Sequence, residues 1–566
     1  MSDIQSCATG TLEEVGSRDH SVTSEYRIYG PPGAGKTTSL SRQIVRAVGR
    51  FGTGSVLVTS FSRAAATELV GRDLPVESSK IGTLHAHCYR ALGCPAIAEA
   101  HVKEWNRLNP HLKITSVNRN RKLDGDEESE DQDSGTATGG DRALQELNRL
   151  RGRVVPPDHW PATVREFARM WKEYKSTRGL FDFCDLIETA LLDFHFAPER
   201  PSVIFVDEAQ DLNKMQLTLL RKWGAHCRYF IVCGDEDQTV FSFSGASPEA
   251  MLDPDIPDDH KIILKQSYRV PRAVHAAADR LIRQVTRRQE KEYLPRPADG
   301  TVLRLSQGGY KSPDYWILKT ALTHLERGKT VMFLASCSYM LQPVIAVLRK
   351  NAIPFHNPYR RTNGFWNPIR DGKKKSAASR ILSLLSAHPD FGCNPRLWTY
   401  RDLALWTEWL VTEGIFKPCA KAVIDAGRDA DPVAIEILDQ IFEPRALESL
   451  LECFEGSYRK LLDWWRRRVT ATVHSRVRFP ADVVMTRGPQ ALMDRPRVIV
   501  GTIHSVKGGE ADVVFLFPDL SRSGDAAYQR HGASRDAVIR LFYVGLTRAR
   551  ETLYICQRES PLAVTI

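Results

Sequence analysis

The stretch RIYGPPGAGKTTSL, residues 27–40, decides the fold. It opens with the end of a short apolar segment, and residues 30–37 then read G-P-P-G-A-G-K-T. These residues fit the pattern G-x-x-x-x-G-K-[ST] of a phosphate-binding loop. A helix is predicted from about Thr38 to Val48, so the loop joins a strand to a helix N-terminus. The alternative is a Gly/Pro turn without a ligand, and the complete match after an apolar strand argues against it.

Each residue type in this loop has a chemical reason to be there. Gly33 and Gly35 allow the backbone to curl so that N–H groups point at phosphate oxygens. Lys36 can reach the β- and γ-phosphates, and the Thr37 hydroxyl can bind Mg²⁺. The positive end of the following helix dipole favours the same anion. The predicted nucleotide-binding residues of the loop are Gly30, Pro31, Pro32, Gly33, Ala34, Gly35, Lys36, Thr37 and Thr38.

Six runs of the chain are typical of buried parallel strands. They are rich in β-branched or aromatic residues, nearly continuous in apolarity, and separated by helical patterns. The segment 385–494 differs, because helix-like patterns dominate it. We therefore predict an α/β fold with parallel sheets. The six runs are SVLVTSF (55–61), SVIFVDE (202–208), YFIVCGDE (229–236), VMFLAS (331–336), RVIVGT (497–502) and VVFLFP (513–518).

Length and composition exclude several classes of protein. The chain has 566 residues, enough for several domains, and no apolar run has the length of a membrane span. Its start, MSDIQSCATG, lacks the basic and apolar regions of a secretory signal. The eleven cysteines include no C-x-x-C pair, which argues against zinc ribbons, iron–sulfur clusters and a disulfide framework. We expect reduced thiols and a cytoplasmic protein without a membrane partner.

The charge distribution favours a polyanionic partner. The net charge is +10, although the run DGDEESEDQD (124–133) alone holds seven acids. The rest of the chain is therefore more basic than the total indicates. Residues 118–141 are polar and nearly free of apolar side chains, and we predict a disordered loop there, inside a helical insertion. Charge alone does not identify a nucleic-acid-binding protein.

Two acidic residues follow the second of these strand-like runs, in VDEAQD (206–211). Asp207 at the strand end is placed to hold Mg²⁺, directly or through water. Glu208 can orient and deprotonate an attacking water. An acidic strand-to-loop junction without a function is the alternative, and the phosphate-binding loop upstream favours the catalytic interpretation.

The segment VCGDEDQTVFSFSGA (232–246) follows the next run. Gln238 is neutral and can contact both a γ-phosphate and a neighbouring element, so it suits a sensor. Phe241 and Phe243 alternate in a loop, where aromatic rings suit base stacking. Ordinary core packing explains these two rings equally well at this point.

Two arginines are the candidates for stabilising transferred charge: Arg269 in LKQSYRVP and Arg548 in LFYVGLTRARETL. Phosphoryl transfer builds charge on equatorial oxygens, and a guanidinium from another domain can neutralise it. For either arginine alone, a surface ion pair is the simpler explanation. The whole set of motifs favours the catalytic one.

Taken in order, these motifs resemble a UvrD/Rep-like helicase of superfamily 1A over nearly the whole chain. The form of the segments 234–246 and 540–550 also separates this group from the 5′→3′ branch of superfamily 1. The matching segments are Gly30–Thr37 (motif I), TSFSRAAATEL (59–69, Ia), GTLHAHCYRAL (82–92, Ib), FDFCDLI (181–187), VDEAQD (II), GDEDQTVFSFSGA (III), SYR (267–269, IV), GTIHSVKGGEADVVF (501–515, V) and RLFYVGLTRAR (540–550, VI).

The resemblance implies a role for each matching residue. Tyr268 would stack on adenine and Glu510 would contact the ribose. The hydrolytic residues would be Lys36, Asp207, Glu208, Gln238, Arg269 and Arg548, with Thr37 and Asp207 on Mg²⁺. The DNA-binding residues would be Phe61, Ser62, Thr83, His85, Phe241, Phe243, Thr502, His504 and Lys507.

The resemblance also implies two RecA-like domains, each interrupted by a mainly helical insertion. The first RecA-like domain would comprise residues 1–92 and 179–261, with residues 93–178 as its insertion. The second would comprise residues 262–384 and 495–566, with a small accessory insertion at 385–494. Closure of the two domains on ATP would drive 3′→5′ movement along single-stranded DNA and the unwinding of tailed duplexes, work that serves DNA replication, repair and recombination.

Departures from the family pattern leave alternatives open. The adenine-reading L-N-x-x-Q element is absent from TLEEVGSRDHSVTSE (11–25), and Thr38 stands where an arginine is common. We therefore expect weak discrimination between ATP and other nucleoside triphosphates. Ser244 replaces an arginine and Gly509 a leucine. A translocase that removes bound proteins with little unwinding is one alternative, and a nucleotide-gated DNA-binding assembly factor is another. We expect a monomer with an unidentified protein partner.

Overall fold

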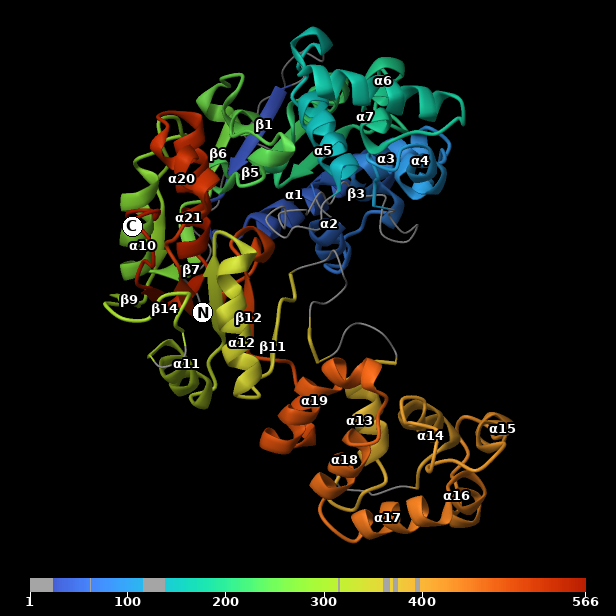
Figure 1. The fold of residues 1–566 in the computed structure, drawn as a ribbon. Helices are drawn as coiled ribbons and strands as arrows, with labels where there is room; N and C mark the ends of the chain where they lie inside the picture. The colour runs from blue at the N-terminus through green and yellow to red at the C-terminus, as the bar shows by residue number, and fades with distance from the viewer. Residues whose placement is uncertain are drawn as a thin grey trace. The chain divides into compact units, whose positions relative to one another are not determined.

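The computed structural model describes residues 24–61, 63–115, 138–313, 316–359, 367–369, 375–391 and 397–566 (Figure 1). The chain divides into two compact units. The first contains residues 1–303, 518–553 and 562–566, and the second contains residues 304–517 and 554–561. The domain boundaries expected from the sequence stay a prediction.

A six-stranded parallel sheet forms the centre of the first unit, in the order β3-β2-β4-β5-β1-β6. Because all strands run the same way, their carboxyl ends lie at one edge, and loops that follow the strands meet there. Ser60 pairs with Asp207 and Tyr29 with Gly234 at this edge. The strands are β1 (Ser24–Tyr29), β2 (Val56–Ser60), β3 (Ile81–Thr83), β4 (Val203–Asp207), β5 (Tyr229–Gly234) and β6 (Lys261–Ile263).

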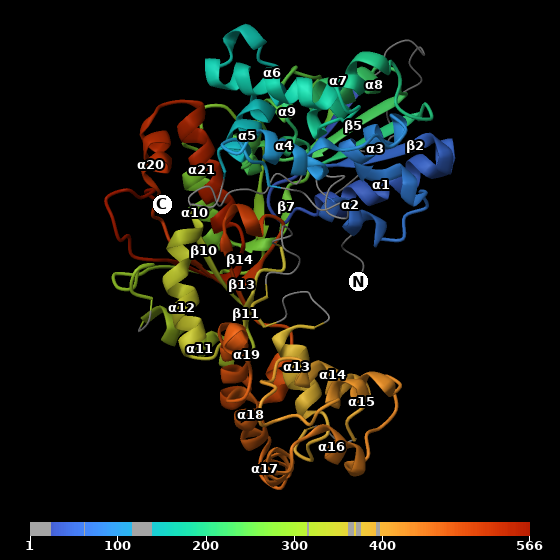
Figure 2. The ribbon, with the colours of Figure 1, turned by 45° about the vertical axis from the view of Figure 1, so that its right-hand side comes forward.

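Helices cover both faces of this sheet, as the near-continuous apolarity of the strands requires (Figure 2). On one face, α1 (Lys36–Phe51) packs Leu40, Ile44 and Ala47 against the sheet. On the other face lie α3 (Leu84–Ala91), α7 (Phe183–Asp193) and α8 (Lys214–Gly224). The short α2 (Arg63–Val70) follows β2. The observed α1 is longer at both ends than the predicted helix at 38–48.

A helical insertion packs on its own aromatic core in the first unit. Its helices are α4 (Val102–Leu108), α5 (Gly139–Gly152) and α6 (Ala162–Ser176), and its core includes Trp105, Phe167, Trp171 and Tyr174. Residues 118–137 of the predicted acidic loop lie outside the described residues. The predicted end of that loop at residue 141 is wrong, because Thr138 and Asp141 form a capping box and α5 begins at Gly139.

The first unit also contains a two-stranded parallel sheet of β7 (Gln266–Pro271) and β8 (Leu294–Arg296). Residues 272–293 connect the two strands through a helix and a loop that returns to β8. The helices of this part are α9 (Glu249–Leu252), α10 (Arg272–Ile282), α20 (Arg522–Gln529) and α21 (Ala533–Leu546).

A second six-stranded sheet runs in the order β11-β12-β10-β13-β14-β9. Strand β10 pairs in parallel with β12 and β13, and β12 pairs in parallel with β11. The six strand-like runs predicted from the sequence are all strands, which confirms the α/β class. The strands are β9 (Thr301–Arg304), β10 (Val331–Ala335), β11 (Phe355–His356), β12 (Val498–Thr502), β13 (Ala511–Leu516) and β14 (Ala549–Ile555), and α11 (Trp316–Glu326) and α12 (Gln342–Lys350) accompany them.

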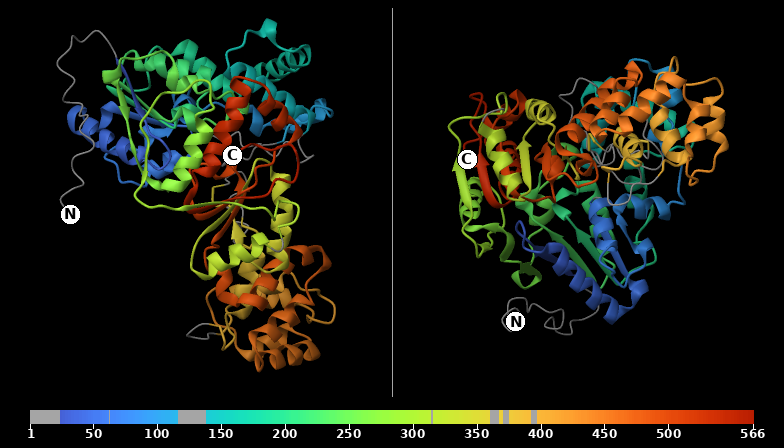
Figure 3. Two further views of the ribbon diagram at one scale, coloured as in Figure 1. Left: turned by 90° about the vertical axis from the view of Figure 1, so that its left-hand side faces the viewer. Right: turned by 90° about the horizontal axis from the view of Figure 1, so that it is seen from below.

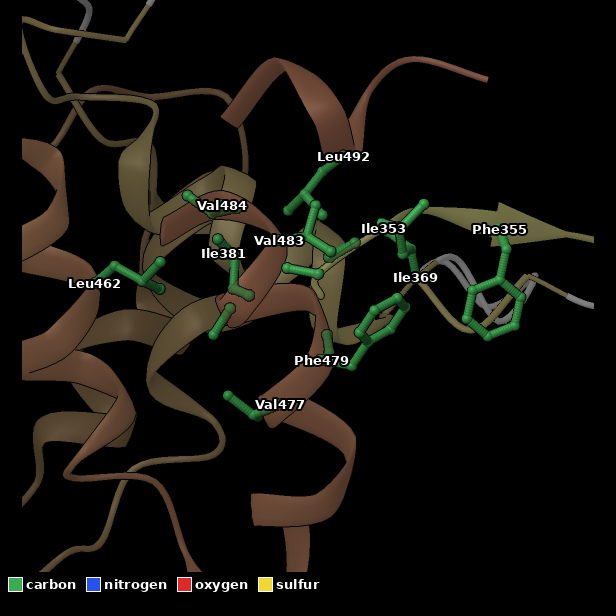
Figure 4. Packing of buried hydrophobic residues seen from close by; sticks show 14 of the residues in the cluster. Ile353, Phe355, Ile369, Ile381, Leu462, Val477, Phe479, Val483, Val484 and Leu492 are labelled. Atoms are coloured by element: carbon green, nitrogen blue, oxygen red, sulfur yellow. The ribbon is translucent and has the colours of Figure 1, made fainter. Parts of the chain in front are cut away.

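In the part of the second unit that the structure describes, the helices between residues 377 and 487 gather in one group (Figure 3). Its apolar core is continuous with that of the sheet, since Phe355 of β11 and Phe479 lie 5.6 Å apart by ring centroid (Figure 4). Trp464 and Trp465 are buried in this core rather than exposed. The helices are α13 (Ala377–Leu385), α14 (Tyr400–Thr407), α15 (Ala420–Ala426), α16 (Ile435–Ile441), α17 (Pro444–Phe454), α18 (Tyr458–Arg466) and α19 (His474–Arg487). Among the described residues, no helix is both long and apolar enough to span a membrane.

Candidate functional site

The phosphate-binding loop follows β1 at the carboxyl edge of the first sheet. Gly33 and Gly35 have φ angles of 74° and 76°, in the left-handed region that glycine adopts without strain. Gly35 caps α1, so the loop ends at a helix N-terminus, as predicted. Lys36 Nζ donates a hydrogen bond to the Gly30 carbonyl oxygen at 2.8 Å, which holds the ammonium over the loop.

Strand β7 and the residue before β8 are hydrogen-bonded to the backbone of this loop. The hydroxyls of Ser267 and Tyr293 each donate to the Pro32 carbonyl oxygen at 2.9 Å, and the Tyr268 N–H donates to the Gly33 carbonyl at 2.9 Å. A Cβ on Gly33 would lie 2.5 Å from the Arg269 Cβ. Tyr268, predicted to stack on the adenine, and Arg269, predicted to act in hydrolysis, therefore lie next to the phosphate-binding loop.

Tyr268 itself is well placed to contact a ligand. Its backbone is held by the loop, yet its side chain is 71% exposed. A phenol ring of that exposure, adjacent to a phosphate-binding loop, suits stacking on a planar base.

Two carboxylates lie at the end of β4. Asp207 is buried, and its Oδ1 accepts a hydrogen bond from the Glu208 N–H at 3.0 Å. Glu208 has a φ of 51°, a strained value for a residue with a side chain and one that functional sites often retain. Gln210 Nε2 donates to Glu208 Oε2. The carboxylate of Asp207 and the hydroxyl of Thr37 are hard oxygen donors, so the residues present fit Mg²⁺.

Gln238 and Arg548 meet in the interior of the first unit. Arg548 Nη2 donates to Gln238 Oε1 at 3.2 Å, and its Nε donates to the Val544 carbonyl at 2.9 Å. The other end of the Gln238 amide donates to Asp235 Oδ2 at 2.7 Å. The predicted sensor and the predicted charge-stabilising arginine are therefore neighbours. Arg548 and Arg269 both fall in the first compact unit. Their assignment to the second RecA-like domain stays a prediction.

Sequence reasoning missed several residues that support this site. Asp235 links two motifs, because its N–H donates to Gln210 Oε1 at 3.0 Å while its carboxylate receives Gln238. Lys291, between α10 and β8, lies against Asp235 and its neighbours. The motif GDEDQ contained the signal for Asp235. Only the fold brings Ser267 and Tyr293 to the phosphate-binding loop and Lys291 to Asp235.

The acidic run Asp235–Asp237 is buried, and its ionisation is shifted accordingly. Burial raises the pKa of Glu236 to about 7, and the neighbouring carboxylates of Asp237 and Asp235 add to this, although Lys291 opposes it. Burial also acts to raise the pKa of Asp235, but Lys291 and Lys36 outweigh it and the net direction is down. Asp235 is therefore the ionised member next to Gln238.

Three aromatic residues predicted to bind DNA lie in the loops that follow β2 and β5 of the first sheet. The rings of Phe61 and Phe241 stack, with centroids 5.4 Å apart and planes at 26°, and Phe243 meets Phe241 edge-on at 5.9 Å. All three are half-buried, so neither full core packing nor full exposure describes them. Exposed Arg153 donates to the Ser242 carbonyl at 3.1 Å, which brings a guanidinium to a loop where Ser244 replaces the usual arginine.

Thr83 and His85 begin α3, and both are buried. The Thr83 hydroxyl accepts from the Ala86 N–H at 3.2 Å and caps the helix. Burial lowers the pKa of His85 to about 4, so its imidazole is neutral at pH 7. Thr83 thus has a structural role as a helix cap, and contact of Thr83 or His85 with DNA stays a prediction. Ser62 lies outside the described residues.

The remaining predicted residues belong to the second unit. Thr502 ends β12, and its hydroxyl accepts from the Ser505 N–H at 3.2 Å. His504, Lys507 and Glu510 follow in the loop before β13 and are partly exposed. The glycine in place of the family's leucine has a local explanation. A Cβ on Gly509 would lie 2.4 Å from the ring of Tyr359.

Comparisons with known proteins point to one family. The UvrD/REP helicase N-terminal domain family matches residues 14–256, and the UvrD-like helicase C-terminal domain family matches residues 497–556. The chain is 21% identical to ATP-dependent DNA helicase PcrA of Staphylococcus epidermidis over 92% of its own length and 80% of that protein. It is 23% identical to ATP-dependent DNA helicase PcrA of Staphylococcus aureus over 93% of its length and 80% of that protein. The two domain matches and the ordered motifs show that the chain belongs to the UvrD/REP helicase family.

Proposed function

We propose that the protein is an ATP-dependent helicase that moves 3′→5′ along single-stranded DNA and unwinds tailed duplexes. The observation that supports this most is the arrangement at one sheet edge. A phosphate-binding loop, a buried Asp207, Glu208 and the Gln238–Arg548 pair all follow parallel strands or pack on them. The stacked Phe61 and Phe241 lie in the loops that follow β2 and β5 of the same sheet.

In the proposed reaction, the loop N–H groups and Lys36 hold the phosphates. Tyr268 stacks on the base and Glu510 contacts the ribose. Mg²⁺, when bound by Thr37 and Asp207, neutralises charge on the phosphate oxygens. Glu208 takes the proton of the attacking water, and Arg269 and Arg548 stabilise the charge that develops. Gln238 contacts Arg548. Release of the γ-phosphate therefore removes one partner of this arginine, and Gln238 stays as another.

Movement on DNA would use the aromatic residues. Base stacking contributes roughly 1–3 kcal/mol per base and does not depend on sequence. Phe61, Phe241 and Phe243 would hold and release successive bases as the nucleotide state changes. Thr83, His85, Thr502, His504 and Lys507 would complete the strand-binding surface, together with Ser62. The proposal includes the two RecA-like domains expected from the sequence, a monomeric state and an unidentified protein partner.

The direct test is strand displacement on two substrates, one with a 3′ single-stranded tail and one with a 5′ tail. The proposal predicts that ATP opens only the 3′-tailed duplex, and that Lys36→Ala and Glu208→Gln abolish it. Opening of only the 5′-tailed duplex would contradict the direction. The same assay with GTP in place of ATP tests nucleotide choice, and the missing adenine-reading element predicts comparable rates.

A second candidate is a translocase that removes bound proteins with little unwinding. Ser244 favours it, because one basic contact of the family motif is replaced. Displacement of streptavidin from a biotinylated single strand, without opening of either duplex, would support this candidate over the helicase.

A further inference from the structure

A buried ammonium lies at the centre of the acidic run Asp235–Asp237. Lys291 is 1% exposed at its side chain, and its Nζ lies 2.5 Å from Asp235 Oδ1, 2.8 Å from Glu236 Oε1 and 3.1 Å from Asp237 Oδ2. Three carboxylates of this kind could hold a metal ion, and here they surround a lysine instead. None of the family motifs identified in the sequence contains this lysine.

Asp235 connects that ammonium to the proposed catalytic residues. One carboxylate oxygen binds Lys291, and the other accepts from Gln238 Nε2 at 2.7 Å. The backbone N–H of Asp235 donates to Gln210 Oε1 at 3.0 Å, and Gln210 contacts Glu208. Asp235 therefore contacts Gln238, the predicted sensor, and Gln210, which in turn contacts the predicted general base Glu208.

The orientation of the Gln238 amide depends on whether the Asp235 carboxyl is ionised or protonated. A glutamine amide has a donor end and an acceptor end, and an ionised carboxylate can only accept. An ionised Asp235 therefore holds the NH₂ group of Gln238, and the carbonyl oxygen turns to Arg548, which can only donate. A protonated Asp235 could donate instead, and the amide could then turn its oxygen away from Arg548.

We propose that Lys291 is a positioning residue for ATP hydrolysis, which acts through Asp235 to fix the orientation of Gln238 toward Arg548. The inference rests on the proposed function, because it concerns the hydrolytic site of that function. Lys291 holds Asp235 in its ionised form despite burial, and the lowered pKa of Asp235 agrees with this.

A general contribution to folding does not explain the placement of Lys291. Arg288 already forms an ion pair with Asp237, at 2.6 Å from Nη2 to Oδ2, and the Gln289 N–H donates to Glu236 Oε1 at 2.9 Å. Those contacts hold the segment 286–291 against the acidic run. Among the ion pairs that the described residues form with this run, Arg288 binds Asp237, whereas Lys291 is the residue that binds Asp235.

The test compares four variants in steady-state ATP hydrolysis with saturating single-stranded DNA. Lys291→Met removes the ammonium and keeps most of the side-chain volume. The double variant Glu236→Gln with Lys291→Met also removes one carboxylate, from a residue that does not touch Gln238. Its buried charge stays balanced, so it replaces Lys291→Met if that single variant fails to fold. Gln238→Ala, alone and combined with Lys291→Met, completes a double-mutant cycle.

Lys175→Met is the matched control. Lys175 is a buried lysine of the same unit that binds two carboxylates, Asp182 and Asp185, away from the phosphate-binding loop. We expect it to lower the melting temperature as Lys291→Met does, and to leave kcat near the wild-type value.

The proposal predicts that Lys291→Met and its charge-balanced form lower kcat by roughly 10²-fold, the usual loss for one mispositioned group in a charge-stabilising site. The KM for ATP should change little, and Lys291→Met should cost nothing further in a Gln238→Ala background. A wild-type kcat in the folded charge-balanced variant would overturn the inference, and so would losses that multiply in the double variant. Wild-type protein without DNA-stimulated hydrolysis would instead refute the proposed function.

Discussion

Arg548 Nη2 lies 3.2 Å from Gln238 Oε1, and 310 residues of chain separate the two. The contact joins the loop after β5 to the turn between α21 and β14, inside one compact unit. A neutral amide between a carboxylate and a guanidinium can report the presence of a γ-phosphate, because a phosphate oxygen competes for the same donors.

The first prediction concerns this contact. Arg548→Lys keeps the positive charge and loses the planar fork of donors, so we expect kcat to fall by about 10³-fold, at the lower end of the effect of a catalytic arginine. The measurement is phosphate release with saturating single-stranded DNA. In a Gln238→Ala background the same change should cost much less, since the two residues act as a unit. Equal losses in both backgrounds would show that the residues act independently.

The second prediction concerns the close approach of β7 to the phosphate-binding loop. Gly33→Ala would place a Cβ 2.5 Å from the Arg269 Cβ at a φ of 74°, so we expect loss of ATP binding and a lower melting temperature. Gly49→Ala is the matched control, because nothing lies within 4 Å of its added Cβ. In α1 that change should stabilise by about 0.5–1 kcal/mol. Equal effects of the two substitutions on nucleotide affinity would contradict this explanation.

The third prediction concerns the stacked rings of Phe61 and Phe241. Phe241→Ala removes one stacking surface, so affinity for a fluorescent oligo-dT should fall by about tenfold, given roughly 1–3 kcal/mol per stacked base. Fluorescence anisotropy measures it directly. Phe196→Ala removes a phenyl ring that is 40% exposed elsewhere in the first unit and should leave the affinity unchanged. Unaltered binding by Phe241→Ala would assign both rings to packing.

The fourth prediction concerns Glu99, which is buried beside Asp182 and accepts from the Phe183 N–H at 3.2 Å. Burial, with a contribution from Asp182, raises its pKa from 4.5 to about 8. The folded chain therefore keeps a proton that the unfolded chain releases. This contribution to stability is complete below pH 4.5 and disappears as the pH rises through 8.

Glu99→Gln removes this dependence, because the amide stays neutral at every pH. Between pH 6 and pH 8, the wild type should lose up to about 1.4 kcal/mol per pH unit more than the variant. Urea unfolding midpoints at the two pH values test it. Glu236, with a pKa of about 7, titrates in both proteins and cancels in the comparison. Parallel pH profiles would contradict the proposed burial of a proton on Glu99.

Much of the fold could be predicted because its strands are locally encoded. The run at 202–208 is apolar and β-branched, and it forms β4 with Asp207 at its end. The loop at residues 30–37 lies at the strand-to-helix turn that its glycines predict. Such features depend on residues a few positions apart, so the sequence pattern alone is sufficient to find them.

The missed features depend on contacts between distant segments. Lys291 is one basic residue in the segment TRRQEK, and no local pattern separates it from a solvated lysine. Its burial follows from the return of the chain from α10 to β8, beside the loop after β5. The close approach of Tyr359 to Gly509, where the family has a leucine, is likewise a tertiary property.

The central claim is that this site hydrolyses ATP in response to single-stranded DNA. Phosphate release by the wild type and by Glu208→Gln, each with and without oligo-dT, tests it most directly, with ATP binding measured in parallel. We expect DNA to stimulate hydrolysis by the wild type strongly, and we expect Glu208→Gln to bind ATP without hydrolysing it. Equal hydrolysis by both proteins, or hydrolysis that DNA does not change, would contradict it.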